Sequence, residues 1–461
     1  MSDTNIQKTI DALRDILGDR LSTGASVLDQ HSHDEAYTKP VLPDAVAFPE
    51  TTEEVSQILR LCSQHGCPVI PYGIGSSLEG HIVPVQGGIT VDTSRMNKVL
   101  HVNQSDLDAV VEPGVTRVQL NEALRATGLM FTVDPGADAT LGGMAATRAS
   151  GTNTVRYGTM ADNVLALEVV LPDGQVIETG SRARKSSTGY DLTHLFIGSE
   201  GTLGIITKLT VKLHGQPEHV AAATCAFPSM ESAVNTVIMA IQMGIPMARV
   251  ELLDALTMKG MNIYNSDLSL PETPHLFLEF HGSEAGVAEQ VESFGALVEE
   301  HGGSGFEWAT KTEDRNRLWE ARHNAYYAGK AVRPGANGVV TDCCVPISAL
   351  ADCLIKAQNL SEDSGFLAPI VGHVGDGNFH LLILVDPDSE DELVRAKDLV
   401  EAINRLALEF GGTVSGEHGI GVGKRKYLPQ EHGAAYALMG TLKKAIDPGN
   451  IMNPGKLVTL N

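Results

Sequence analysis

Two short stretches in the last quarter of the chain contain the side chains best suited to chemistry. The first, GHVGDGNFH at 372–380, sets a histidine on each side of a glycine-rich turn, and the second, GEHGIGVGK at 416–424, places a glutamate and a histidine among glycines. His373, His380, Glu417 and His418 are residue types that bind metal ions, transfer protons, or lie buried as satisfied polar groups. Because the chain has 16 histidines, the rest of the sequence must decide between these alternatives.

The apolar runs around the first stretch predict a pair of strands. In IVGHVGDGNFHLLILV, His373 ends one strand and His380 starts the next, and the glycine turn folds the chain back between them. The two imidazoles can then face one point. With Glu417 they form a set of two neutral nitrogens and one carboxylate, which suits zinc, manganese or ferrous iron and leaves coordination positions open for a substrate.

Length and composition indicate a folded protein of two or three lobes. The chain has 461 residues, of which 43% are hydrophobic and 20% charged, and its 47 glycines favour shaped loops over disorder. The formal charge of −23 argues against binding to nucleic acid or to an anionic membrane surface. A small carboxylate substrate would therefore need a local cation.

Targeting features and cysteine spacing favour a reducing compartment. The six cysteines show neither zinc-type spacing nor a disulfide framework. The first residues follow an acidic amphipathic helix pattern without the features of a signal or transit peptide, and no run of 18 apolar residues occurs. We expect a cytoplasmic protein without a membrane span.

The order of elements changes near residue 216. Before it, strands and helices alternate, with a helix capped by Thr51 or Thr52 and a hairpin, VLALEVVLPDGQVIET, that turns at Pro172-Asp173-Gly174. After it, apolar strand patterns alternate with helices at 283–301 and 389–410, which is typical of an antiparallel sheet covered by helices. We expect an α+β fold with a first domain at 1–216, a cap domain at 217–425, and a helical segment at 426–461 that returns to the first domain.

Three segments rich in small residues stand out in the first domain. They are PYGIGSSLEGH at 71–81, DPGADATLGGMAATRASGTNTVRYGT at 134–159 and GSEGTLG at 198–204. Such segments either bring backbone amides to an anion or form ordinary solvent loops. They contain neither a Walker loop nor the Gly-x-Gly-x-x-Gly pattern of nicotinamide binding. Three such segments favour one large dinucleotide over three separate phosphate sites.

These segments, together with LWEARHNAYYA, TDCCVPIS, SGEHGIGVGK and NIMNPGK, resemble the vanillyl-alcohol oxidase superfamily, and within it the D-lactate dehydrogenase branch. The resemblance covers nearly the whole chain in order. It implies a PCMH-type FAD-binding domain that holds FAD non-covalently, and an α+β cap domain with a central antiparallel sheet. The positions that match flavin contacts are Pro71, Gly73, Gly75, Ser76, Ser77, Pro135, Gly136, Thr140, Gly142, Gly143, Gly151, Asn153, Glu200, Gly204, Ile206 and Asn453.

The same resemblance assigns roles to the cluster of histidines. His373, His380 and Glu417 match the ligands of a divalent metal, expected here to be zinc or manganese, with iron as a further candidate. His418 matches the base that removes the hydroxyl proton of a 2-hydroxy acid, and the alternative for it is a partner that orients Glu417.

The local cation that the acidic chain requires is predicted at Arg322. In the family the matching arginine binds the substrate carboxylate, and a guanidinium fork suits that group. From the residues alone, an ordinary ion pair with Glu320 or Asp314 on the same helix explains Arg322 equally well.

Two positions differ from the related D-2-hydroxyglutarate dehydrogenases, which carry a lysine and an asparagine for the distal carboxylate. Here those positions hold Val340 and Leu382, which would leave a second carboxylate buried without partners. The expected substrate is therefore D-lactate or another short apolar D-2-hydroxy acid. Tyr326 and Tyr327 either border this pocket or belong to the core.

The expected reaction passes a hydride to the flavin and then electrons to a quinone, a cytochrome or an electron-transferring flavoprotein. A homodimer is an assembly that the sequence leaves open. The alternatives are the FAD subunit of a glycolate oxidase, an enzyme like D-2-hydroxyglutarate dehydrogenase, and a non-redox flavoenzyme of the alkyl-glycerone-phosphate synthase type.

Overall fold

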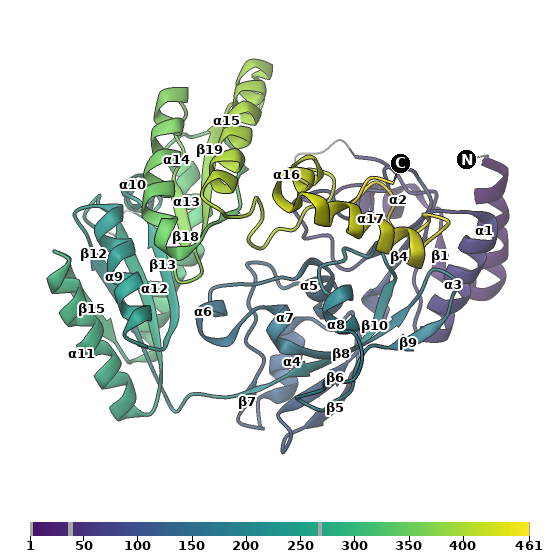
Figure 1. The fold of residues 1–461 in the computed structure, drawn as a ribbon, viewed down its shortest axis with the longest axis horizontal. Helices are drawn as coiled ribbons and strands as arrows, with labels where there is room; N and C mark the ends of the chain where they lie inside the picture. The colour runs from purple at the N-terminus through teal and green to yellow at the C-terminus, as the bar shows by residue number, and fades with distance from the viewer. Residues whose placement is uncertain (1–2, 36–39, 266–269, 461) are drawn as a thin grey trace. The chain divides into compact units, whose positions relative to one another are not determined.

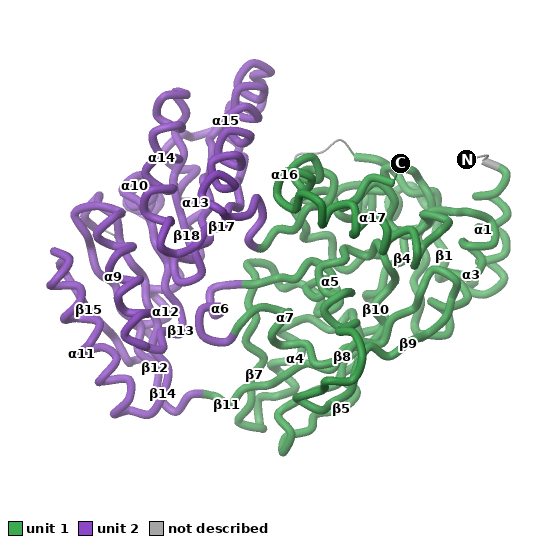
Figure 2. Tube along the Cα trace, viewed as in Figure 1, with its two compact units in different colours: residues 1–150, 158–216, 417–461 green, residues 151–157, 217–416 purple. Residues whose placement is uncertain are grey.

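The protein is described by a computed structural model, which covers residues 3–35, 40–265 and 270–460. The chain forms two compact units (Figure 2). Unit 1 consists of residues 1–150, 158–216 and 417–461, and unit 2 of residues 151–157 and 217–416. The chain therefore passes between the units four times.

A small mixed sheet lies in the first part of unit 1 (Figure 1). Within the described ranges its strand order is β1-β2-β4-β3, with β1 antiparallel to β2 and the other pairs parallel. The predicted helix after Thr51 is confirmed, since the Thr51 side chain accepts a hydrogen bond from the Glu54 amide. The elements are α1 (Asp3–Leu17), β1 (Leu21–Ser22), α2 (Ala25–Gln30), β2 (Ala45–Ala47), α3 (Thr52–His65), β3 (Val69–Tyr72) and β4 (Ile89–Asp92).

A second, antiparallel sheet forms the other half of unit 1. Its order, among described residues, is β5-β6-β10-β8-β9, and the pairing of β8 with β9 confirms the hairpin predicted around Pro172-Asp173-Gly174. Short helices cover its buried face. The elements are β5 (Val99–Asn103), β6 (Asp108–Val111), α4 (Arg117–Leu124), β7 (Leu129–Met130), α5 (Leu141–Thr147), α7 (Met160–Asn163), β8 (Val164–Val170), β9 (Val176–Glu178), α8 (Leu192–Phe196), β10 (Ile205–Lys212) and β11 (His214–Gly215).

The C-terminal segment completes unit 1. Helices α16 (Leu428–His432) and α17 (Ala434–Ile446) lead into an irregular tail, in which Met452 forms a parallel bridge to Val69 of β3. The buried ammonium of Lys443 pairs with Asp447 and donates to the Thr202 and Met452 carbonyls, each at 2.8 Å. The bridge attaches Met452 to the sheet of β1–β4, and the bonds of Lys443 attach α17 to Thr202 and to this tail.

Unit 2 is built on one antiparallel sheet, which confirms the prediction for the second half of the chain. In the ranges described, its order is β15-β12-β14-β13-β18-β19-β16, with β17 also paired to β19. The strands are β12 (His219–Ala226), β13 (Met247–Leu253), β14 (His275–Gly282), β15 (Ser304–Ala309), β16 (Asn337–Val340), β17 (Cys343–Cys344), β18 (Ile370–His373) and β19 (Asn378–Val385).

The two faces of this sheet differ because successive side chains alternate between them. One face carries the main apolar core and is covered by α9 (Met230–Gln242), α11 (Glu284–Glu300), α14 (Leu350–Ser364) and α15 (Glu390–Glu409). The other face packs a smaller cluster against α10 (Ala255–Tyr264), α12 (Thr312–His323) and α13 (Ala325–Ala331). Helix α6 (Thr154–Tyr157) also belongs to unit 2. No helix in the described residues is long and apolar enough to cross a membrane.

Candidate active site

The two histidines of the first stretch lie on one face of a confirmed hairpin between β18 and β19. In its register Val371 pairs with His380 and His373 pairs with Asn378. Residues two positions apart share a face, so the side chains of His373 and His380 are diagonal neighbours. Their ring centroids are 5.5 Å apart, with the ring planes at 83°. The turn requires Gly377, which has a φ of 81°.

Each of the two rings has its Nδ1 atom bound to an acceptor. The Nδ1 of His373 lies 2.7 Å from Oε1 of Glu251, and the Nδ1 of His380 lies 2.9 Å from the Thr341 carbonyl oxygen. Since carboxylates and carbonyls only accept, Nδ1 carries a proton in both rings, and in the neutral form of each ring the lone pair therefore lies on Nε2. This is the state in which histidine binds metals, so the two residues fit a divalent ion.

Glu251 was not predicted from the sequence, although it is central to this face. It lies on β13, is 0% exposed, and its Oε2 accepts hydrogen bonds from Arg322, with Nε at 3.0 Å. Burial alone would raise the pKa of Glu251, but the charges and hydrogen bonds of His373 and Arg322 lower it overall. The one feature of the sequence that could have identified Glu251 is that it is a glutamate within the apolar strand sequence MARVELL.

Arg322 occupies a place consistent with its predicted role. Its partner is Glu251 on the sheet rather than Glu320 or Asp314 on its own helix, and its side chain is only 14% exposed. The alternative of an ordinary ion pair along the helix surface is therefore wrong. Binding of a substrate carboxylate by Arg322 stays a prediction.

The two positions chosen for substrate size are direct neighbours in the sheet. Val340 on β16 pairs with Leu382 on β19, and Leu382 lies two residues after His380, so both share the face of that histidine. Leu382 is 5% exposed. Its side chain packs over Gly338, beside Tyr326. This part of the face is apolar.

Hydrogen bonds to Asp342 hold Ser415 and Gly416, the last two residues of unit 2, which directly precede Glu417 in the chain. The buried carboxylate of Asp342 accepts hydrogen bonds from Ser415 Oγ at 2.7 Å and Asn378 Nδ2 at 2.9 Å, and its carbonyl accepts from the Gly416 amide at 3.1 Å. Glu417 follows Gly416 directly, and consecutive Cα atoms lie about 3.8 Å apart. Asp342 was another residue that the sequence did not reveal as part of the site.

In unit 1 the segment after His418 is held by Glu200. The buried carboxylate of Glu200 accepts from the amides of Ile420 at 2.7 Å and Gly421 at 2.9 Å, and lies 3.2 Å from Nε2 of His81. Although burial opposes both charged forms, the pair lowers the pKa of Glu200 and raises that of His81. The structure thus gives Glu200 a role in supporting this loop, and its flavin contact stays a prediction.

The predicted flavin segments of unit 1 adjoin one another. A Cβ on Gly73 would lie 2.5 Å from Thr140 Oγ1, and one on Gly201 would lie 2.6 Å from Cγ of Pro71. Asn453 Nδ2 donates to the carbonyls of Glu200 at 2.7 Å and His81 at 2.9 Å. Segments distant in sequence therefore form one glycine-lined cradle, which fits a large cofactor approached by backbone.

The remaining predicted flavin residues are of two kinds, those that are closely packed against other protein atoms and those that are not. A Cβ on Gly142 would lie 2.5 Å from Pro113, and one on Gly204 would lie 2.7 Å from the Val170 carbonyl, so close packing already explains both glycines. Gly136, by contrast, faces open space. Local packing also accounts for Gly75, whose φ is 77° and whose added Cβ would meet Tyr72 Oη, and for Gly143, whose added Cβ would lie 3.0 Å from Thr140 Oγ1. Ser77 Oγ donates to Asp34 Oδ2 at 3.0 Å. The remaining predicted flavin positions of unit 1 are Ser76, Pro135 and Ile206.

Two predicted flavin residues, Gly151 and Asn153, belong to unit 2 by their packing. Asn153 Oδ1 accepts a hydrogen bond from Arg249 Nε at 2.9 Å. Arg249 in turn stacks on Trp319, with its guanidinium carbon 4.8 Å from the ring centroid. The short segment around α6 is thereby attached to the sheet of unit 2.

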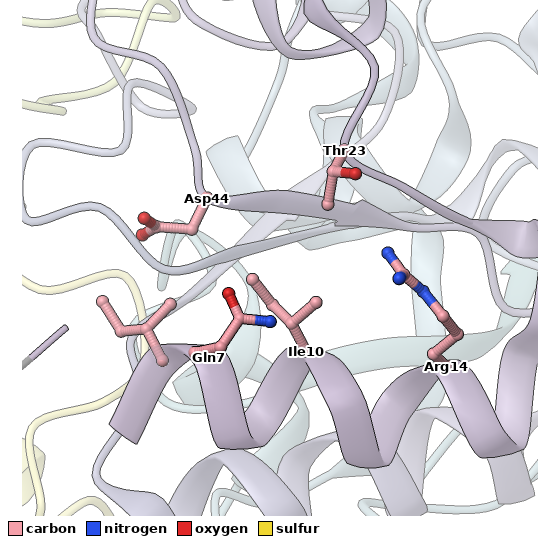
Figure 3. A pocket seen from close by; sticks show the side chains of 6 residues that line it. Gln7, Ile10, Arg14, Thr23 and Asp44 are labelled. Carbon is pink, nitrogen blue, oxygen red and sulfur yellow. The ribbon is translucent and has the colours of Figure 1, made fainter. Parts of the chain in front are cut away.

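A hollow elsewhere in unit 1 is separate from these residues. It has a volume of about 460 Å³ and is lined by Ile6, Gln7, Ile10, Arg14, Thr23 and Asp44 (Figure 3). The view shows helix α1 forming one wall. None of the predicted site residues lines it, so it takes no part in the proposed chemistry.

Comparisons with known proteins identify related chains over nearly the full length. Residues 43–180 match the model of an FAD binding domain, and residues 216–457 match that of the C-terminal domain of FAD linked oxidases. The "Probable D-lactate dehydrogenase, mitochondrial" of Danio rerio is 48% identical over 99% of this chain and 92% of that protein. The "D-lactate dehydrogenase [cytochrome], mitochondrial" of Arabidopsis thaliana is 44% identical over 98% and 80%.

The fold agrees with that of a solved structure. The crystal structure of p-cresol methylhydroxylase with substrate bound superposes with a TM-score of 0.83, at 19% identity, over 99% of this chain and 98% of that one. At this identity the likeness concerns the fold alone, and it confirms the expected PCMH-type α+β architecture.

Proposed function

The chain belongs to the family of FAD-linked oxidases, in the group that includes the D-lactate dehydrogenases, and we propose that it oxidises D-lactate to pyruvate with FAD and a divalent metal. It is an FAD-dependent oxidoreductase by family. The choice of D-lactate rests on the relatives' names, and the metal on the two histidines whose Nδ1 atoms are held by acceptors.

The side chains of this protein have distinct tasks in the proposed reaction. Arg322 binds the substrate carboxylate, and His373, His380 and Glu417 hold the ion. When bound, FAD supplies the hydride acceptor and the ion supplies a Lewis acid that lowers the pKa of the substrate hydroxyl. His418 would then take the hydroxyl proton on its imidazole, as a positioned general base.

The observation that supports a short substrate with a single carboxylate is the Val340–Leu382 pair. A second carboxylate against these side chains would be desolvated without a cation or donor. We propose D-lactate and 2-hydroxybutyrate as substrates, with electrons passing to a quinone, a cytochrome or an electron-transferring flavoprotein. A homodimer remains compatible with this proposal.

Anaerobic stopped-flow reduction of the flavin tests the proposal. The purified, FAD-loaded chain is mixed with D-lactate, L-lactate, glycolate or D-2-hydroxyglutarate, with and without prior removal of the metal by a chelator. Bleaching by D-lactate alone, abolished by the chelator and restored by Zn²⁺ or Mn²⁺, is the expected result.

Other outcomes identify the alternatives. Reduction by L-lactate but not D-lactate contradicts the stereochemistry, and faster reduction by glycolate favours a glycolate oxidase subunit. Retained flavin with no bleaching by any 2-hydroxy acid favours non-redox flavin chemistry. Reduction that is unaffected by complete metal removal contradicts the metal requirement.

A further inference from the structure

We propose that Glu251 is a positioning residue that couples the metal site to the substrate-carboxylate site. It fixes the tautomer of His373 and holds the guanidinium of Arg322 with the same carboxylate. This inference rests on the proposed function, because it assigns His373 to the metal and Arg322 to the substrate.

The two oxygens of Glu251 serve different partners. Oε1 lies 2.7 Å from Nδ1 of His373, while Oε2 accepts from both Nε and Nη2 of Arg322. The side chain is fully buried on β13, between α12 and β18. One carboxylate therefore determines the orientation of two side chains that come from different elements.

The contact also determines how Arg322 can receive a substrate. A guanidinium binds carboxylates either at its Nε–Nη2 side or at its Nη1–Nη2 end. Because Glu251 occupies the Nε–Nη2 side of Arg322, a substrate carboxylate must bind at the Nη1–Nη2 end of the guanidinium. Glu251 thus orients the arginine as well as the histidine.

Replacement by glutamine separates the two roles. Glutamine has the same shape, but it offers one accepting oxygen and one donating amide group. If the oxygen faces Arg322, the amide group faces His373, whose Nδ1 must then accept, so that its proton moves to Nε2. That tautomer cannot bind a metal through Nε2. The reverse orientation would point an amide donor at a guanidinium, so the first arrangement is favoured.

A rescue follows from the same geometry. In Glu251→Gln combined with Arg322→Met, no guanidinium competes for the amide oxygen, which can rotate to accept from Nδ1 of His373. The metal-binding tautomer is then restored, although the substrate cation is lost. A merely structural role for Glu251 predicts the opposite, namely that the double substitution binds metal no better than the single one.

Unit 2 offers a matched control in Glu279 on the adjacent strand β14. Glu279 is also a buried carboxylate, it lies 2.7 Å from Nε2 of His281, and it is 3.7 Å from Nε of Arg249. The histidine it contacts is not among the proposed ligands. Glu279→Gln therefore makes the same chemical change, in the same sheet, beside a histidine that is not a proposed metal ligand.

The experiment measures metal affinity rather than turnover. FAD-loaded, metal-free wild type, Glu251→Gln, Glu251→Gln/Arg322→Met and Glu279→Gln are titrated with Zn²⁺ against a competing fluorescent chelator, and with Co²⁺ to record its visible spectrum. We expect Glu251→Gln to weaken Zn²⁺ binding about 10- to 100-fold. The double variant should recover most of this loss, and Glu279→Gln should bind as the wild type does.

The results separate this inference from the proposed function. Equal affinity in wild type and Glu251→Gln, or no recovery in the double variant, overturns the role of Glu251 while leaving the proposed function standing. A wild type that binds neither ion overturns the metal-dependent function as well. If Glu251→Gln does not fold, Glu251→Asp replaces it, because its carboxylate, set back by one methylene, cannot reach both partners. Unweakened binding in that variant overturns the proposal.

Discussion

The pairing of Val340 with Leu382 predicts a change in substrate choice that can be engineered. Replacing both residues, by Val340→Lys and Leu382→Asn, places a cation and an amide on neighbouring strands, on the face that carries His380. In the wild type, the distal carboxylate of D-2-hydroxyglutarate would be buried against two aliphatic side chains. An uncompensated buried charge costs about 3–5 kcal/mol, which corresponds to about 10²- to 4 × 10³-fold in kcat/KM.

The double variant should recover part of this free energy. Each hydrogen bond to the carboxylate contributes about 1.5–3 kcal/mol, so the ratio of kcat/KM for D-2-hydroxyglutarate over D-lactate should rise by about 10²-fold or more. A cost in stability accompanies it, because Leu382 is 5% exposed and packs with Leu384 and Ala336. Loss of that buried side chain should lower the free energy of unfolding by about 2–5 kcal/mol.

The assay is steady-state dye reduction with both substrates, together with thermal unfolding of each variant. Val339→Lys is the matched control, since it adds the same charge one residue earlier, on the opposite face of β16. The reasoning is refuted if the wild type uses both substrates equally well. It is also refuted if the folded double variant keeps the wild-type ratio.

Three further results are expected from unit 1. His418→Ala should retain FAD and metal but lose about 10²- to 10⁴-fold in the rate of flavin reduction by D-lactate, and an undiminished rate would show that His418 is not the base. The ion pair of Glu200 and His81 should stabilise the fold most between about pH 4.3 and 6.5, the pKa values of the two groups in the unfolded chain. Its contribution to the free energy of unfolding is lost in acid, as the pH falls through the lowered pKa of Glu200. It is also lost at higher pH, as the pH rises through the raised pKa of His81. The difference in Tm between wild type and Glu200→Gln should follow that profile, and a pH-independent difference would contradict it. Gly201→Ala should weaken FAD retention on gel filtration, because Gly201 has a φ of 68° and its new Cβ would meet Pro71, whereas Gly215→Ala, at a position with open space and no predicted flavin contact, should retain FAD as the wild type does.

The sequence correctly predicted the features that depend on residues close together in the chain. The hairpin carrying His373 and His380 followed from apolar runs around a glycine turn, and the antiparallel sheet of the second half followed from apolar strand patterns that alternate with helices. Both are confirmed, as are the fold class and the family. The residue roles at the metal and flavin, and the cytoplasmic location, stay predictions.

The parts that sequence reasoning missed depend on distant pairings. Glu251 lies 122 positions before His373, and only the strand order, which sets β13 beside β18, brings them together. Asp342 likewise accepts a hydrogen bond from the amide of Gly416, which lies 74 positions later in the chain. A charged residue in an apolar strand does signal a buried partner, but it does not indicate which of many distant residues that partner is.

The fourfold passage of the chain between the units has a consequence for synthesis on the ribosome. The sheet of β1–β4 is made by residues 21–92, yet it lacks Met452, Asn453 and Lys456 until residues 93–451 have been translated as well. At about 5–20 residues per second, making residues 217–416 alone takes about 10–40 s. During that time the nascent first unit exposes the edge and core surface that the C-terminal tail later covers. Residues 452–456 are therefore required before the sheet of β1–β4, which is made much earlier, can complete its contacts.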